Sequence, residues 1–166
     1  MTYSTHILTG LLAGGTILLQ HSDPQFALLS ATLVGSILPD IDEPNSYAGR
    51  SNRGTSHLIK ALFGHRGITH SLLGLAFISA IIYAVIYYYQ LDIQYLIFFN
   101  IGYLSHIMTD LLTKSGVPLL FPYKKNLKIP IIRTGDKKEV VFRTLIFIGI
   151  AFQIGNYLKY EIEKFL

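Results

Sequence analysis

Nineteen consecutive residues, Ser71 to Tyr89, carry no formal charge, and this run constrains the fold more than any other feature of the sequence. As a helix the run would measure about 28 Å, close to the roughly 30 Å hydrocarbon thickness of a bilayer. The whole chain of 166 residues is 51% hydrophobic and 14% charged, with a mean hydropathy of +0.42. Soluble domains carry about 25% charged residues. The sequence therefore predicts a membrane protein.

Four further apolar segments accompany this run, and together the five predict an all-α fold. They lie at about residues 5–20, 25–39, 71–89, 93–112 and 140–158. We interpret residues 1–166 as a single integral membrane domain, a polytopic helix bundle with long polar loops at 40–70 and 113–139. The first two segments are shorter and contain glycines. They form either close-packed spanning helices, which we favour, or a buried hairpin that only partly crosses.

Lysine and arginine are unequally distributed between the two sides that five spans would define. The side with the N-terminus and both long loops carries twelve, and the other side carries two, Lys159 and Lys164. The positive-inside rule therefore predicts a multi-pass protein of the cell (inner) membrane with its N-terminus and long loops in the cytoplasm. This orientation accounts for the net charge of +4, and no recognition motif for nucleic acid appears, so we expect no nucleic-acid partner.

Histidine and aspartate residues gather on the same predicted cytoplasmic side, at the ends of separate segments. Taken singly they have ordinary interpretations, with His106 as a packing residue and with Asp40 and Asp42 as turn residues. Ionisable residues at membrane helices are costly, however, and usually mark a site. Their convergence favours a metal site at the cytoplasmic helix ends. The predicted ligands are His6, Asp40, Asp42, His65, His70, His106 and Asp110.

Spacing within the sequence supports this interpretation. His106 and Asp110 are four residues apart on a predicted helix, so their side chains share one face. A weak internal repeat, THILTGL at 5–11 and THSLLGL at 69–75, gives His6 and His70 equivalent positions. The repeat predicts two helical hairpins related by a pseudo-twofold axis, with ligands at matching ends.

The chain has no cysteine, so any metal must be bound through nitrogen and oxygen atoms. Histidine and aspartate suit zinc, which we favour, or manganese or iron. Seven ligands are more than one tetrahedral ion needs, so the alternative of a centre with two metal ions stays open. Guanidinium groups grip phosphate or carboxylate groups, and we assign substrate binding to the arginines of the first long loop, Arg50, Arg53 and Arg66.

Five motifs occur in order along the chain. They are TH at 5–6, LPDIDEPNS at 38–46, GHRGITHS at 64–71, GYLSHIMTD at 102–110 and GVPLLFP at 116–122. In these motifs the chain resembles the YdjM-like family of membrane-bound, metal-dependent hydrolases. The resemblance implies a helical membrane protein whose metal site is formed by the seven predicted ligands. The residues after Pro122 carry no comparable motif.

These features predict a membrane-embedded hydrolase that acts on a phosphoester or lipid-type substrate at the cytoplasmic surface through a metal-activated water. Asp42 and Arg66 are the predicted catalytic residues. The alternative is a metal-binding membrane protein without catalysis, either a transporter or a regulator, although ligands gathered at helix ends on one side favour the enzyme. Basic loops also predict contact with anionic phospholipid, through Lys124, Lys125, Lys128, Lys137 and Lys138.

Overall fold

The computed structural model describes all residues except 22, 23, 65, 124 and 166, and the regular elements of that part of the chain are helices. In chain order they are α1 (Tyr3–Leu18), α2 (Leu28–Ile37), the 3-10 helix η1 (Leu38–Asp42), α3 (Tyr47–Ser51), α4 (Arg53–Phe63), the 3-10 helix η2 (Ile68–His70), α5 (Leu72–Tyr89), α6 (Gln94–Leu111) and α7 (Lys137–Phe165). Isolated bridges join Thr113 to Ile132 and Val117 to Leu127. The predicted all-α class is confirmed.

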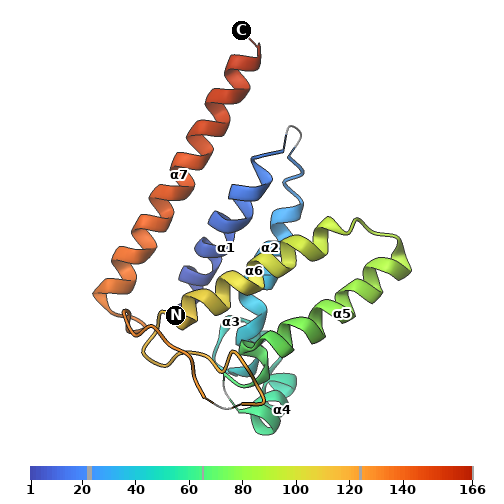
Figure 1. The fold of residues 1–166 in the computed structure, drawn as a ribbon, viewed down its shortest axis with the longest axis vertical. Coiled ribbons are helices and arrows are strands. Elements are labelled where there is room, and N and C mark those ends of the chain that lie inside the picture. Colours follow the sequence, from blue (N-terminus) through green and yellow to red (C-terminus); the bar gives the residue numbers. More distant parts are fainter. Residues whose placement is uncertain (22–23, 65, 124, 166) are drawn as a thin grey trace.

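The centre of the bundle is formed by α1, α2 and α6, which pack against one another (Figure 1). Two glycines bring the backbones of α2 and α6 together, since a Cβ atom on Gly35 would overlap the carbonyl group of Phe99 and one on Gly102 would overlap that of Thr32. Small residues commonly permit such close helix contacts in membrane proteins. Buried hydrophobic side chains flank this contact, namely Leu18, Leu28, Phe98, Phe99, Tyr103 and Ile107.

Within the described residues, two helices are long and apolar enough to cross a membrane: α5 and the stretch Lys137–Lys164 of α7. The prediction of five spans is therefore wrong. Helices α1 and α2 have 16 and 10 residues and measure only about 24 Å and 15 Å. Helix α6 has 18 residues, but polar side chains, including His106 and Asp110, interrupt its apolar sequence.

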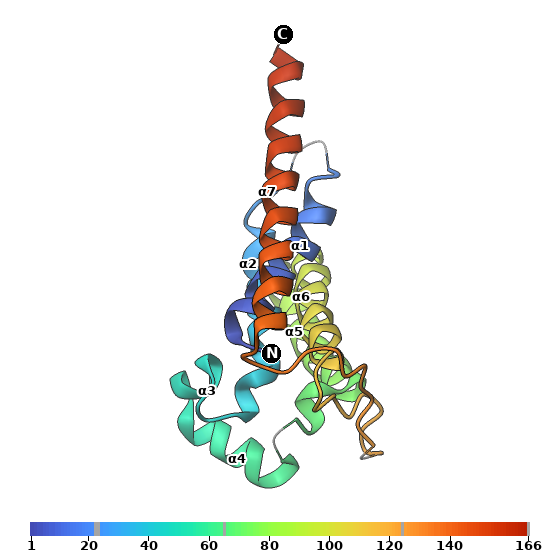
Figure 2. The same cartoon turned by 90° about the vertical axis from the view of Figure 1, so that its left-hand side faces the viewer.

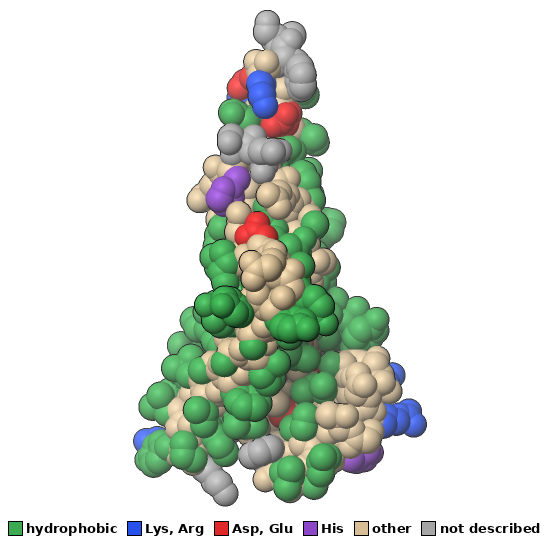
Figure 3. All heavy atoms as spheres, turned by 90° about the vertical axis from the view of Figure 1, so that its right-hand side faces the viewer, with side chains coloured by type: hydrophobic (Ala, Val, Ile, Leu, Met, Phe, Trp, Pro, Cys, Tyr) green, Lys and Arg blue, Asp and Glu red, His purple; other side chains and the backbone are tan. Residues whose placement is uncertain are grey.

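The two candidate spans leave much of their hydrophobic surface exposed. Helix α7 packs mainly against α1 and extends beyond it (Figure 2). Phe77 on α5 and Phe147 and Phe152 on α7 are each more than 60% exposed. On the face that Figure 3 shows, many hydrophobic side chains lie over the middle and lower part of the molecule, and lysine and arginine side chains lie at the lower corners and near the upper tip. An exposed apolar surface of this extent is suited to contact with lipid.

The short helices η1, α3, α4 and η2 and the loop before α7 lie together at one end of the bundle, which we call the base (Figures 1 and 2). The segment 40–70, expected to be a loop, is thus largely helical. Ser46 caps α3 by accepting a hydrogen bond of 2.9 Å from Gly49 N, and Ser71 caps α5 by accepting one of 3.1 Å from Gly74 N. Both α5 and α7 begin at the base.

Candidate metal centre

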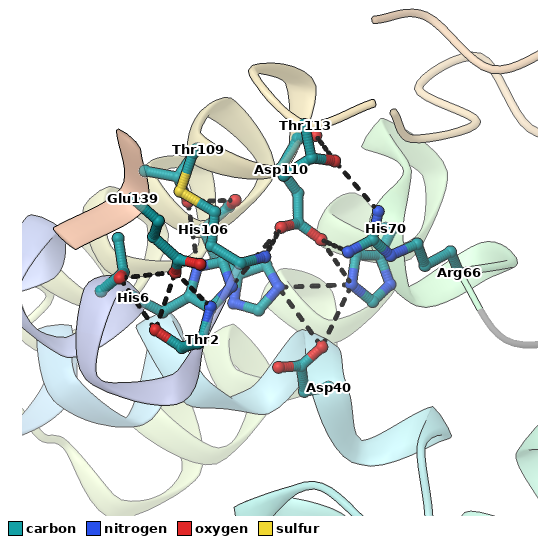
Figure 4. A network of polar contacts seen from close by, with 12 residues as sticks. Thr2, His6, Asp40, Arg66, His70, His106, Thr109, Asp110, Thr113 and Glu139 are labelled. Atoms are coloured by element: carbon teal, nitrogen blue, oxygen red, sulfur yellow. Dashed lines mark hydrogen bonds and ion pairs between the residues drawn. The ribbon is translucent and has the colours of Figure 1, made fainter. Parts of the chain in front are cut away.

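Three histidines from separate helices meet at the base, contributed by α1 (His6), η2 (His70) and α6 (His106). His106 lies between the other two (Figure 4). Its ring stacks on that of His6 with 3.7 Å between centroids, and its Nε2 atom lies 3.2 Å from Nε2 of His70. All three side chains are at most 1% exposed. The predicted convergence of these histidines is therefore present in the structure.

Two carboxylates lie on opposite sides of this row (Figure 4). Asp110 approaches Nε2 of His6 at 3.5 Å and Nε2 of His70 at 3.8 Å, and Asp40 approaches Nε2 of His70 at 3.5 Å and Nε2 of His106 at 3.7 Å. Ligand atoms about 2.1 Å from a tetrahedral zinc ion lie about 3.4 Å from one another. The spacing therefore suits two metal triplets that share His106, namely His6, His106, Asp110 and Asp40, His70, His106.

The other nitrogen of each histidine, Nδ1, contacts a group outside the cluster. Nδ1 of His106 donates to Ser36 O at 2.8 Å. The Thr109 hydroxyl donates its single hydrogen to His106 O, so it accepts from Nδ1 of His6 at 2.9 Å. When the rings are neutral, both Nε2 atoms therefore present lone pairs to the cluster.

His70 follows the same pattern. The Thr69 hydroxyl donates to Asp42 Oδ2 at 2.7 Å, which leaves its oxygen to accept from Nδ1 of His70 at 3.1 Å. Metal-binding histidines in general have their second nitrogen fixed in this way by an outer partner. The cluster thus fits a metal ion in its donor atoms, in its spacing and in the tautomer that each ring is held in.

Among the described residues, Asp42 belongs to neither of the two metal triplets. It is fully buried behind His70, where it accepts hydrogen bonds from Arg66 N at 2.8 Å and from the Thr69 hydroxyl at 2.7 Å, and it lies 3.5 Å from Nδ1 of His70. The structure therefore gives this predicted ligand the place of an outer partner of His70. His65, another predicted ligand, lies outside the described residues.

Arg66 contacts the cluster directly. One of its terminal nitrogens, NH2, lies 2.8 Å from Asp110 Oδ2, and the other, NH1, donates to Gly116 O at 3.1 Å and to the Thr113 hydroxyl at 3.2 Å. The residue adopts a left-handed backbone with φ of 57°, uncommon outside glycine, in the turn that carries this side chain inward. Asp110 also contacts the backbone nitrogen of Met1.

A cavity of about 900 Å³ adjoins the cluster at the base. Asp40 and Arg66 line it from the cluster side, Arg50 lines it from α3, and the stacked rings of Tyr3 and Tyr47 lie in its wall. Arg53 instead borders a separate hollow with His57 and Lys60. Of the three arginines predicted to bind substrate, the structure thus brings two to this cavity.

Hydrogen bonds between His70 and the neighbouring aspartates shift the pKa values of His70 and Asp40. Burial alone would lower the pKa of His70, but hydrogen bonds to Asp40 and Asp42 outweigh it and raise this pKa to about 9. Burial alone would raise the pKa of Asp40, but its hydrogen bond with His70 outweighs it and lowers this pKa to about 2. In the metal-free cluster His70 is therefore an imidazolium, and a bound metal would have to displace its proton.

One residue near the centre was not predicted. Glu139, in the first turn of α7, is 2% exposed and accepts hydrogen bonds from Thr2 N, from the hydroxyls of Thr2 and Thr5, and from Gly135 N, at 2.6 to 2.7 Å. Through these hydrogen bonds Glu139 holds α7 to the start of α1. One of its partners, Thr5, directly precedes His6. Its signal in the sequence is an acidic residue directly before an apolar segment, where a charge needs a partner.

The helical fold, the two apolar candidate spans and the buried cluster at one end of the bundle together define a helical membrane protein with a candidate metal centre. Its sequence matches the YdjM inner membrane protein family over residues 1–162. The chain therefore belongs to this family, as its motifs predicted, and an inner-membrane location follows. The orientation of the chain and the hydrolase activity stay predictions.

Relatives in three bacteria illustrate this membership. The inner membrane proteins YdjM of Escherichia coli (strain K12) and Shigella flexneri are each 38% identical over 109 residues, which are 63% of this chain and 54% of theirs. The chain thus matches about half the length of these relatives. YvsG of Bacillus subtilis (strain 168) is 30% identical over 140 residues, 84% of this chain and 85% of that protein. No solved structure matches the chain.

Proposed function

We propose that this protein is a metal-dependent hydrolase of the inner membrane that acts on a phosphoester, of the kind found in lipid headgroups, at the cytoplasmic surface. The observation that carries the proposal is a set of three buried, inward-facing histidine Nε2 atoms and two carboxylates, one buried (Asp110) and one partly exposed (Asp40), beside a cavity lined by Arg50 and Arg66. Imidazole nitrogens and carboxylates at this spacing fit a divalent cation, and the arginines fit an anionic substrate.

The metal would be held by one of the two triplets, either His6, His106 and Asp110 or Asp40, His70 and His106. Zinc is favoured over manganese or iron. Nδ1 of His106 donates a hydrogen bond to Ser36 O, so only the Nε2 atom of this ring is free to bind a metal ion. His106 would therefore act as a ligand in only one of the two triplets at a time. A bound divalent ion supplies an activated water near neutral pH and neutralises charge on a phosphate oxygen.

The chain's own residues would bind and orient the substrate. Arg66, anchored by Thr113 and Gly116 and paired with Asp110, presents a fixed cation at the floor of the cavity. Arg50 adds a second cation from the other wall. Asp40 lines the cavity and has a lowered pKa, so it would be ionised near neutral pH and suited to binding the cation rather than to accepting a proton. Asp42, predicted as catalytic, would instead orient His70.

The base would face the cytoplasm. Both candidate spans begin there, and the two long segments that carry most lysines and arginines lie at that end. This orientation would place the cavity at the level of lipid headgroups.

The activity is tested with detergent-purified protein and a panel of phosphoesters and phospholipids, assayed with zinc, manganese or iron. We expect hydrolysis by the wild type and by His57→Ala, a control histidine outside the cluster, and loss of hydrolysis in His70→Ala and Arg66→Ala. Zinc binding without hydrolysis of any phosphoester, by wild-type protein that is folded, would refute the enzyme and leave the metal centre standing.

That outcome would support the second candidate, a metal-binding membrane protein that regulates or transports rather than catalyses. The near-complete burial of His6, His70, His106 and Asp110 favours the regulator over the transporter, because a structural metal needs no access whereas a transported ion must enter and leave. Release of zinc across the membrane of a vesicle, abolished by His106→Ala, would identify transport.

A further inference from the structure

A second cavity, of about 360 Å³, lies between α4, η2, α5 and α6 and is separate from the cavity beside the metal centre. Its walls are mostly hydrophobic, with Ile59 from α4, Ile68 and Thr69 from η2, Phe77 and Ile78 from α5, and Tyr103 from α6. The two polar side chains in this wall already have partners. The Thr69 hydroxyl donates to Asp42, and the Tyr103 hydroxyl donates to Thr69 O at 2.5 Å. A polar ligand would therefore find few free groups there.

The wall of this cavity includes part of the exposed hydrophobic face of α5. Phe77 belongs to the second turn of α5, a candidate span, and is 62% exposed. Farther along the same helix, Ile81 and Val85 are also exposed. Because the chain belongs to a family of inner membrane proteins, this hydrophobic face meets acyl chains rather than water. The cavity, next to the start of the span, lies at the depth where the acyl chains begin.

Helix α4 is amphipathic in a way that agrees with this position. Leu58, Ile59 and Leu62 share one face, and Leu58 and Leu62 are 59% and 66% exposed. On the other face, His57 and Lys60 border a polar hollow, and Lys60 pairs with Glu43 at 2.7 Å. Such helices lie in the membrane interface with the apolar face toward the acyl chains. With α4 in that position, Ile59 and the cavity behind it open toward lipid.

We propose that this cavity binds an acyl chain of a membrane phospholipid. An apolar cavity offers water no hydrogen-bond partners, whereas a flexible hydrocarbon chain entering from the adjacent bilayer gains contacts along its length. The bound chain packs against Thr69 and Tyr103, and Thr69 is the residue that holds Asp42 and Nδ1 of His70. Lipid thus lies directly behind the outer partners of the candidate metal centre. This site does not depend on whether the protein is a hydrolase.

The test uses full-length protein in vesicles of phosphatidylethanolamine and phosphatidylglycerol that contain a phospholipid with a photoreactive diazirine in its acyl chain. Adducts are located by peptide mass spectrometry. We expect adducts on Ile59 and Ile68 in the wild type and in Ile78→Leu, which keeps the cavity open. Ile78→Trp, which fills the cavity, should lose these adducts and keep those on the exposed Ile81 and Val85. Ile59→Trp fills the cavity from α4 and gives a second test should Ile78→Trp fail to fold.

Two results would overturn the proposal. One is labelling of the wild type at Ile81 and Val85 alone, and the other is undiminished labelling of Ile68 in both folded tryptophan variants. A disulfide between copies carrying Leu62→Cys, formed in a chain that has no native cysteine and accompanied by no lipid adduct at Ile59, would assign the cavity to a second copy and likewise contradict it.

Discussion

The Nε2 atoms of His70 and His106 lie 3.2 Å apart, and both side chains are fully buried. Since the Nδ1 atoms of both rings are directed at outer partners, two neutral rings would place their lone pairs against each other. A cation between them removes this repulsion, and either a proton on His70 or a metal ion can serve as that cation. Proton and metal therefore compete for one position, which leads to the first prediction.

Zinc affinity should rise with pH. The pKa of His70 is raised to about 9, so below that value zinc must displace its proton, and above that value it need not. We expect the apparent affinity to increase by up to about tenfold per pH unit between about pH 6 and pH 9 and then to level off. Competition with a chromophoric chelator measures it. An affinity that stays constant over this range would show that His70 is not a ligand.

Asp42 and Asp110 should differ in their effect on zinc binding, because Asp42 supports His70 from behind whereas Asp110 faces the cation. Loss of an outer partner typically lowers metal affinity about 10–100-fold, which is the effect we expect for Asp42→Asn. Asp110→Asn should lower it further. Glu43→Gln, a neighbouring change in a surface ion pair with Lys60, should leave it unchanged. Equal losses in the two aspartate variants would return Asp42 to the set of direct ligands.

The hydroxyl group of Thr109, rather than the shape of its side chain, should stabilise the fold and the position of His6. Thr109→Val leaves the Nδ1–H group of His6 without its acceptor in a buried site, a loss of about 1–3 kcal/mol in the free energy of unfolding. Thr109→Ser keeps the hydroxyl and should stay close to wild type in unfolding and in zinc affinity. Thermal unfolding in detergent distinguishes the two, and a valine variant as stable as the serine variant would contradict this role.

Glu139 should stabilise the contact between α7 and α1. Glu139→Ala removes the acceptor for Thr2, Thr5 and Gly135, and we expect it to lower the free energy of unfolding by about 1–3 kcal/mol. The matched control is Glu163→Ala at the exposed end of the same helix, where an ion pair with Lys159 should contribute little. A stability of Glu139→Ala equal to that of Glu163→Ala would rule the role out.

Much of this arrangement was predictable because it depends on residue type and order. Apolar runs predicted five helical segments, and ionisable residues at their ends predicted a shared site, since a charge beside an apolar helix needs a partner. Motifs predicted the family. The number of spans was overestimated because an apolar run does not reveal whether a helix fills its whole length, and α2 begins only at Leu28 and ends at Ile37.

Which residues face the cation and which contact the histidines from outside depends on local backbone geometry, and this geometry could not be predicted from the sequence. Asp40 and Asp42 are two residues apart on a 3-10 helix, which has three residues per turn, so their side chains point in different directions. An extended segment would have placed them on one face. The partners of the histidines are hydroxyls of Thr69 and Thr109 and a backbone carbonyl at Ser36, and such groups occur throughout any sequence.

The central claim, that the buried cluster is a metal centre, is tested most directly by the zinc content of the purified protein. The measurement is made by mass spectrometry after equilibration with zinc and removal of the excess, on wild type, His106→Ala and His21→Ala, the last altering an exposed histidine that follows the C-terminal end of α1. We predict stoichiometric zinc in wild type and His21→Ala and its loss in a folded His106→Ala. Folded wild type without zinc, manganese or iron, or equal zinc in all three proteins, would contradict the account.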